Sequence, residues 1–173
     1  MISALVAVAT PVDADAIDRL ADTLGALVAG VAGGLVGDAV IVTAGAADAG
    51  LATVAEATGA TLVVSGADDP WAAAARAARR DWVLCLEAGD VPAEGWIRTL
   101  DRFVGTARSD AVLGRLRRPH ASWAVRLARP VERLVGARTV RAGDVLRRDR
   151  LARGARLAPR LTVRPLIGRV DRP

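Results

Sequence analysis

Two carboxylates, three positions apart, follow an apolar run near the middle of the chain. The run, residues 82–86, is typical of a buried strand in a parallel sheet, and it ends in Glu87-Ala88-Gly89-Asp90. Ligands of open α/β sheets bind beyond the carboxyl ends of the strands. Glu87 and Asp90 are therefore candidates to hold a metal ion or a sugar nucleotide.

The sequence around this run predicts strands that alternate with helices. Apolar, β-branched segments end at proline, glycine or aspartate, and segments with helical periodicity follow them. The expected strands are 2–9, 39–43, 61–65, 82–86, 111–116 and 161–163, and the expected helices are 13–28, 48–58, 68–80, 92–104, 120–134 and 142–153. This order predicts the α/β class, with three layers and a mostly parallel sheet flanked by helices.

Length and composition agree with a single globular domain. The chain has 173 residues, of which 52% are hydrophobic and 3% aromatic, so its core must be built from valine, leucine and alanine. Cys85 is the only cysteine and lies inside the apolar run. A disulfide within the chain is thereby excluded, and Cys85 is expected to be a buried thiol.

Charge is divided unevenly along the chain. Residues 1–90 hold 4 Arg and 12 acidic residues, whereas residues 91–173 hold 20 Arg and 7 acidic residues, and lysine is absent. Such a division favours an anionic partner for the second half, such as a phosphate, an acidic lipid surface or a nucleic acid. Two alternatives stay open: a solvated basic surface paired with the acidic half, and a GC-rich genome that favours arginine and alanine codons.

No segment reads as a membrane or export signal. The apolar start of the chain lacks a basic segment before it, and the uncharged run 24–37 is too short to span a bilayer. The sequence thus predicts a cytoplasmic protein, which could also associate peripherally with the inner face of the membrane.

An ordered series of landmarks in the first half resembles a family 2 glycosyltransferase of the GT-A fold. The segments ATPVDADA, IVTAGAADAG, ATGATLVVS and AARRDWVLCLEAGDVPAEGW resemble its first strand, its second strand and loop, its third strand and its acidic metal motif. More weakly, ARTVRAGDVLRRDRLARG is similar to an acceptor-side segment of small members. The resemblance implies one domain over 1–173, with a nucleotide-sugar-binding half (1–105) and a shortened, Arg-rich acceptor-side half (106–173).

The resemblance also implies a donor site. It places Pro11, Thr43, Gly45 and Asp48 around the nucleotide-sugar, and it implies a divalent cation, Mg²⁺ or Mn²⁺, held by the acids after the fourth strand. Hard cations of this kind take oxygen ligands. Two departures stand out. Thr43 and Ala44 occupy positions where the family usually has an aspartate, and Glu87 and Asp90 replace two aspartates separated by one residue.

The metal motif leaves two readings open. A turn at Gly89 could bring Asp90 back to the cation, because glycine permits a tight backbone. Alternatively, Glu87 and Asp90 only end a strand and a turn, and Asp90 helps to cap the following helix.

The general base that inverting members of the family use has no clear counterpart here. They deprotonate the acceptor hydroxyl with a carboxylate, commonly from a Glu-Asp pair, and no such pair occurs after residue 100. Asp144 is the best remaining candidate. Its alternative reading is the N-cap of an expected helix.

The sequence is compatible with more than one function. Residues 120–135 predict a helix with an apolar face and several arginines, which fits either a membrane surface or the protein core. The resemblance implies transfer from a nucleotide-diphospho-sugar to an unknown acceptor, lipid-linked or polysaccharide. The alternative is a non-catalytic, degenerate member that acts as a binding or scaffold partner. Nucleic-acid binding is not favoured, because no recognised motif accompanies the arginines.

Overall fold

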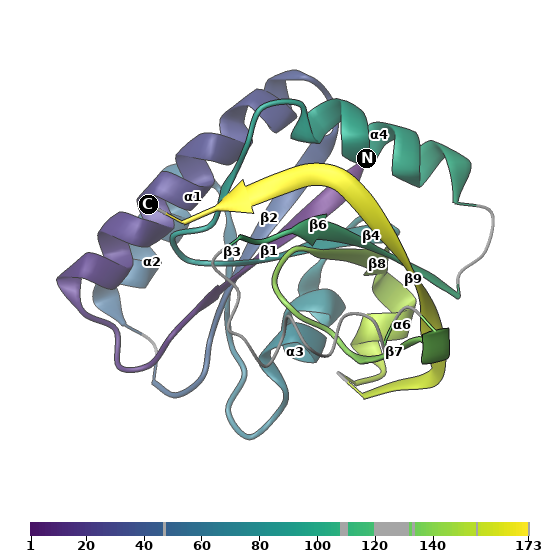
Figure 1. The fold of residues 1–173 in the computed structure, drawn as a ribbon. Helices are drawn as coiled ribbons and strands as arrows, with labels where there is room; N and C mark the ends of the chain where they lie inside the picture. Colours follow the sequence, from purple (N-terminus) through teal and green to yellow (C-terminus); the bar gives the residue numbers. More distant parts are fainter. Residues whose placement is uncertain (47, 108–110, 120–131, 133, 155, 173) are drawn as a thin grey trace.

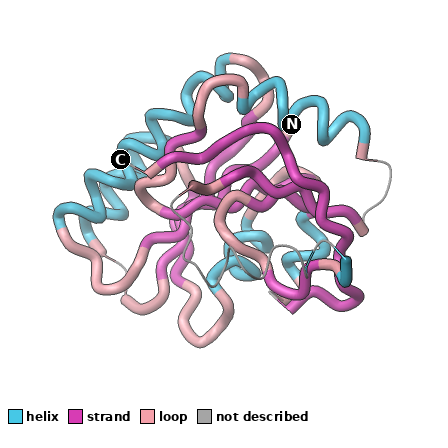
Figure 2. The backbone as a smooth tube through the Cα atoms, in the orientation of Figure 1, coloured by secondary structure: helices cyan, strands magenta, loops and turns pink. Residues whose placement is uncertain are grey.

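A computed structural model of the chain describes residues 1–46, 48–107, 111–119, 132, 134–154 and 156–172. The described strands form one mixed sheet of nine strands in the order β3-β2-β1-β4-β8-β6-β9-β5, with β7 paired to β9 (Figures 1 and 2). Neighbouring strands among β1–β4 are parallel, and β8 joins β4 in the antiparallel sense. The three-layer α/β class predicted from the sequence is confirmed.

The elements follow the expected alternation through the first hundred residues. The strands are β1 Ile2–Val8, β2 Val36–Thr43, β3 Thr61–Val64, β4 Trp82–Glu87, β5 Val91–Pro92, β6 Val112–Arg117, β7 Ala137–Thr139, β8 Asp144–Arg147 and β9 Arg156–Asp171. The helices are α1 Ala14–Ala32, α2 Ala49–Thr58, α3 Pro70–Ala77, α4 Trp96–Thr106 and α6 Arg148–Ala152.

The period of two along the central strands divides the core between the two faces of the sheet. Trp82, Leu84 and Leu86 of β4 pack in one cluster with residues of α1, α2 and α4. Val83 and Cys85, which alternate with them, pack in a second cluster with residues of α3 and α6. Figure 1 shows the corresponding helix layers on the two sides of the sheet. A strand buried on both faces explains why 82–86 is continuously apolar.

Aspartates begin the first three helices, as their positions in the sequence suggest. The side chains of Asp13, Asp48 and Asp69 each accept a hydrogen bond from a backbone N–H of the first turn of α1, α2 and α3. Because each cap fixes where its helix starts, the loop before it is held at the carboxyl edge of the sheet.

The second half differs from the sequence-based expectation in three places. The helix expected at 92–104 begins only at Trp96, because Pro92 pairs with Val170 in β5–β9. The helix expected at 142–153 is the strand β8 followed by the short helix α6. The short strand expected at 161–163 is part of the 16-residue strand β9. The helix expected at 120–134 lies almost entirely outside the described residues.

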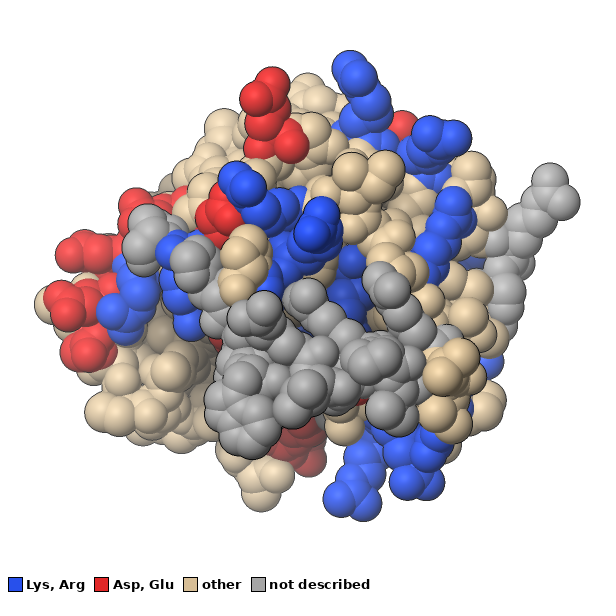
Figure 3. Space-filling model, viewed as in Figure 1, with Lys and Arg blue, Asp and Glu red and all other residues tan. Residues whose placement is uncertain are grey.

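The strand β9 connects the basic half to the first half of the fold. It runs parallel to β6 and antiparallel to β5, and Figure 1 shows it as a long bent arrow that passes α4 and ends near α1. In the space-filling view, acidic side chains gather over the α1 side and arginines over the α4 and β9 side (Figure 3). The charges on this face are therefore unevenly distributed, although blue side chains also lie among the red ones on the α1 side.

No helix within the described residues is long and apolar enough to cross a membrane.

Candidate functional site

The turn after β4 brings Asp90 back onto the strand. The backbone N–H of Glu87 donates to Oδ2 of Asp90 at 2.8 Å, and the N–H of Asp90 donates to the carbonyl of Glu87 at 2.9 Å. Gly89 makes this turn possible because its φ is +93°, in the region that side-chain-bearing residues avoid. The side chain of Asp90 is fully buried, whereas that of Glu87 is 42% exposed. Asp90 does not cap α4, whose N-cap is Gly95.

Two arginines from the basic half lie on these carboxylates. Arg118, directly after β6, donates through one NH2 group to Oδ1 of Asp90 at 2.6 Å and to Oε2 of Glu87 at 3.1 Å. Arg172, directly after β9, donates to the same Oε2 at 3.1 Å and to the carbonyl of Ala88 at 3.1 Å. Burial raises the pKa of Asp90, and the guanidinium of Arg118 opposes this shift. The four side chains form a closed cluster of two positive and two negative charges.

The loops after β1 and β2 lie beside this turn. Val8 and Thr43 are register partners at the carboxyl ends of the two strands, and the hydroxyl of Thr10 donates to the carbonyl of Ala44. The N–H of Ala88 donates to the carbonyl of Ala7 at 2.9 Å, which places the acid turn at the end of β1. Parallel pairing thus gathers the three segments at one edge of the sheet, where ligands of such folds bind.

The four residues expected around a nucleotide have different environments at this edge. Pro11 is exposed and follows a cis peptide bond, and Gly45 adopts a φ of +110° in the adjacent loop. Thr43 is buried, and its hydroxyl has no hydrogen-bond partner among the described residues. Asp48 caps α2 by accepting from the N–H groups of Gly50 and Leu51 at 2.8 and 3.2 Å.

Asp144 lies away from solvent at the start of β8. Its fully buried carboxylate accepts from Nε and NH2 of Arg115 at 2.6 and 2.8 Å and from the backbone N–H of Arg141 at 2.9 Å. Glu132 receives hydrogen bonds from both arginines. Burial raises the pKa of Asp144, and the bonds from Arg115 oppose this shift. Asp144 therefore starts a strand instead of capping the expected helix, and its oxygens face arginine in place of an acceptor hydroxyl.

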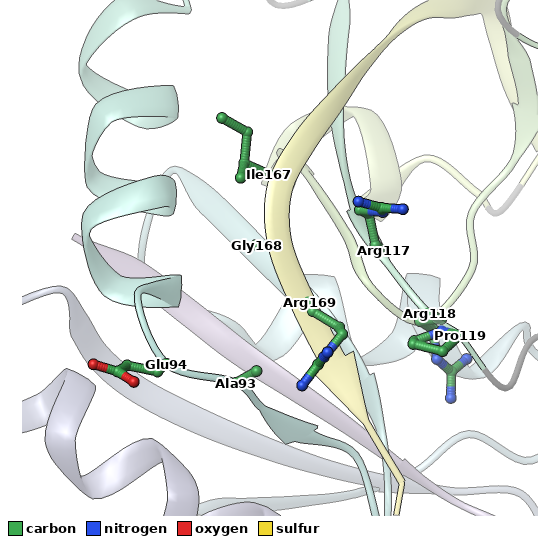
Figure 4. Close-up of a pocket in the computed structure, with 8 residues that line it drawn as sticks. All are labelled: Ala93, Glu94, Arg117, Arg118, Pro119, Ile167, Gly168 and Arg169. Carbon is green, nitrogen blue, oxygen red and sulfur yellow. The ribbon is translucent and has the colours of Figure 1, made fainter.

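A cleft of about 600 Å³ adjoins the acid turn through Arg118. Figure 4 shows Arg117 and Arg118 at the end of β6, Arg169 on β9, and the loop residues Ala93 and Glu94 beside them. The carboxylate of Glu94 points away from Arg169 in this view. Volumes of this size are typical of small-molecule sites, and three arginines along one cleft favour an anionic group.

Solved structures share this architecture. Glucosyl-3-phosphoglycerate synthase from Mycobacterium tuberculosis, in complex with Mn²⁺, UDP-glucose and phosphoglyceric acid, matches with a TM-score of 0.58 at 15% identity, over 87% of this chain and 57% of that chain. The chain has a GT-A fold. A second complex of that enzyme, with Mn²⁺, UDP and glucosyl-3-phosphoglycerate, matches the GT-A chain with a TM-score of 0.55 at 15% identity, over 87% and 58% of the two chains.

A structure described as a mycobacterial protein matches this GT-A chain more completely, with a TM-score of 0.57 at 17% identity, over 99% of this chain and 65% of that chain. The chain thus spans between 57% and 65% of the length of these three structures. No family model and no curated protein matches the sequence.

The donor set at the acid turn does not fit the divalent cation that the fold implies. Both oxygens of Asp90 already accept hydrogen bonds, and the Oε2 of Glu87 receives two guanidinium groups. Elsewhere in the described part of the chain, no group of three or more His, Cys, Asp or Glu side chains could hold a metal ion. A cation at the turn would have to displace Arg118, whose side chain is only 20% exposed.

Sequence reasoning found the acids of this site but missed the arginines. Arg118 and Arg172 lie 28 and 82 positions after Asp90, outside the segments that carry the resemblance. The one available signal was the excess of arginine after residue 90, which indicates an anionic partner without selecting particular residues.

Proposed function

We propose that this protein is a nucleotide-sugar-dependent glycosyltransferase of the GT-A type, related to family 2. The donor is a nucleotide-diphospho-sugar bound at the edge formed by the loops after β1 and β2 and by the acid turn. The observation that carries the proposal is the placement of these three segments at one edge of a GT-A sheet, beside an arginine-lined cleft.

In this proposal, the two halves of the chain form the sites for different substrates. Residues 1–105 form the nucleotide-sugar-binding half. Residues 106–173 form the acceptor-side half and also reach the acid turn through Arg118 and Arg172. Arg117 and Arg169 in the cleft favour an acceptor with a phosphate or carboxylate group. Phosphoglyceric acid, which is bound in the complex of the Mycobacterium tuberculosis synthase, has this chemistry.

A second candidate, binding without transfer, has one specific observation in its favour. The carboxylates of Glu87, Asp90 and Asp144 are all engaged by arginine, so none of them is poised to take a proton from an acceptor hydroxyl. In this reading the protein holds a nucleotide-sugar for a partner protein.

Titration calorimetry with UDP-glucose, GDP-mannose and the free diphosphates tests the proposal. We expect one nucleotide-sugar to bind, and the matching free diphosphate to compete with it. A circular-dichroism spectrum of the same sample shows that the protein is folded. Absence of binding by any nucleotide-sugar, with and without MnCl₂, would refute both candidates.

Product analysis then separates the two candidates. A transferase releases nucleoside diphosphate from the bound donor, slowly to water and faster with a phosphorylated acceptor. A binding protein leaves the donor intact over the same period.

A further inference from the structure

The charge cluster at the acid turn has the same charge balance as a metal site. A divalent cation held by two carboxylates gives a neutral group, and so do Arg118 and Arg172 on Glu87 and Asp90. Arg172 also approaches Asp90, with Nε 3.9 Å from Oδ1. Two positive charges therefore lie where the fold would otherwise place a metal.

The backbone is shaped to admit these two side chains. A Cβ atom on Gly89 would lie 3.5 Å from Nε of Arg172 and 3.2 Å from Cδ of Arg19. A Cβ atom on Gly143 would lie 3.4 Å from Cδ of Arg118, and Gly143 has a φ of +88°. Glycine at both positions satisfies the backbone and leaves room for the guanidinium groups.

Both arginines are also placed to reach a ligand. Arg118 lines the cleft of about 600 Å³, and the side chain of Arg172 is 42% exposed. A guanidinium group has five N–H donors in a planar fork, which matches the oxygens of a phosphate. Arg172 contacts the acid turn through its NH2 and Nε groups.

We propose that Arg118 and Arg172 replace the divalent cation and bind the diphosphate of the nucleotide-sugar, so that donor binding is independent of metal. This proposal rests on the proposed function, because it assumes a diphosphate donor at this edge. Asp90 then positions Arg118, Glu87 competes with the diphosphate for both arginines, and neither carboxylate contacts a metal ion.

The test is calorimetric titration of UDP, with GDP and ADP in parallel, into the full chain in EDTA and separately in MnCl₂. We expect the affinity in the two buffers to agree within about twofold. In EDTA, Arg172→Gln should weaken diphosphate binding by about tenfold or more, because a charge-assisted hydrogen bond is lost. Binding of uridine, which has no phosphate, should not change.

Glu87→Gln separates the guanidinium site from a metal site by the direction of its effect. If arginines bind the diphosphate, removal of a competing carboxylate raises its affinity, by about two- to fivefold for a half-exposed group. If a metal binds it, removal of a ligand lowers the affinity. Glu56→Gln, an exposed change of equal charge at the far end of α2, is the matched control, as Arg153→Gln is for Arg172→Gln.

The outcomes distinguish this proposal from the one on which it depends. Diphosphate binding that requires MnCl₂ and weakens with Glu87→Gln overturns the guanidinium site and leaves the proposed function standing. Absence of diphosphate binding in both buffers overturns both. Thermal denaturation of each variant shows that its fold is retained.

Discussion

Asp144→Ala is expected to destabilise the protein by about 3–5 kcal/mol, because it removes one partner from a buried ion pair. The Asp144 side chain is fully buried, and Arg115, which donates two hydrogen bonds to it, is 11% exposed. The variant would leave the guanidinium of Arg115 with only Glu132. Urea denaturation followed by circular dichroism measures this loss of unfolding free energy.

Two further variants serve as controls for Asp144→Ala. Asp149→Ala, an exposed aspartate paired with its neighbour Arg148, should change the unfolding free energy by less than about 0.5 kcal/mol. Asp144→Asn keeps an acceptor for the N–H of Arg141. Its loss of unfolding free energy should lie between the losses of Asp149→Ala and Asp144→Ala. If Asp144→Ala abolished sugar transfer and left stability unchanged, Asp144 would be the general base after all.

The second large effect is expected at Arg118. Arg118→Met leaves Asp90 fully buried, with the N–H of Glu87 as its remaining hydrogen bond and Nε of Arg172 at 3.9 Å. We therefore expect the unfolding free energy at neutral pH to fall by about 3 kcal/mol or more. Arg117→Met is the matched control. Its exposed side chain forms no ion pair with a described residue, and its effect should stay below about 0.5 kcal/mol.

The pH dependence of this loss identifies its cause. Burial raises the pKa of Asp90 above its unfolded value, and removal of Arg118 raises it further. For such a carboxyl group, stability is present below the unfolded pKa and lost as pH rises through the folded pKa. The difference between wild type and Arg118→Met should therefore shrink as the solution is acidified. A difference that is constant with pH would mean that lost packing, and not the stranded charge of Asp90, destabilises the variant.

The first half of the fold could be predicted because its elements are defined locally. Strand β4 is apolar on both faces, and the aspartates before α1, α2 and α3 cap helices whose periodicity is visible in the sequence. Each element there can be recognised without knowledge of its neighbours. The parallel order then follows from the alternation of strands and helices.

The second half could not be predicted in the same way, because its strands depend on distant partners. Val145 and Leu146 lie in a segment rich in arginine that suits a helix, yet they pair with β4 over 60 positions away. Strand β9 contains Pro159 and Pro165, which argue against a long strand. It is held by β6, which pairs along residues 162–169, and by β5, which pairs with Val170 and Asp171.

The candidate site shows the same limit. The placement of Glu87 and Asp90 after a buried strand follows from the local sequence, and so does the turn at Gly89. Their arginine partners directly follow β6 and β9, and only the tertiary structure brings them to the turn. The strand-end position of the acids made them candidates for a metal ion, and the resemblance specified a divalent cation, but the hydrogen bonds from Arg118 and Arg172 occupy the carboxylate oxygens that would bind it.

The most direct measurement of the central claim is a crystal structure of the protein with UDP and MnCl₂, with anomalous scattering recorded to locate manganese. The account predicts UDP at the edge formed by the loops after β1 and β2, its diphosphate bound by Arg118 and Arg172, and no anomalous peak at Glu87 or Asp90. UDP bound elsewhere, or manganese on these two carboxylates with the arginines displaced, would contradict it.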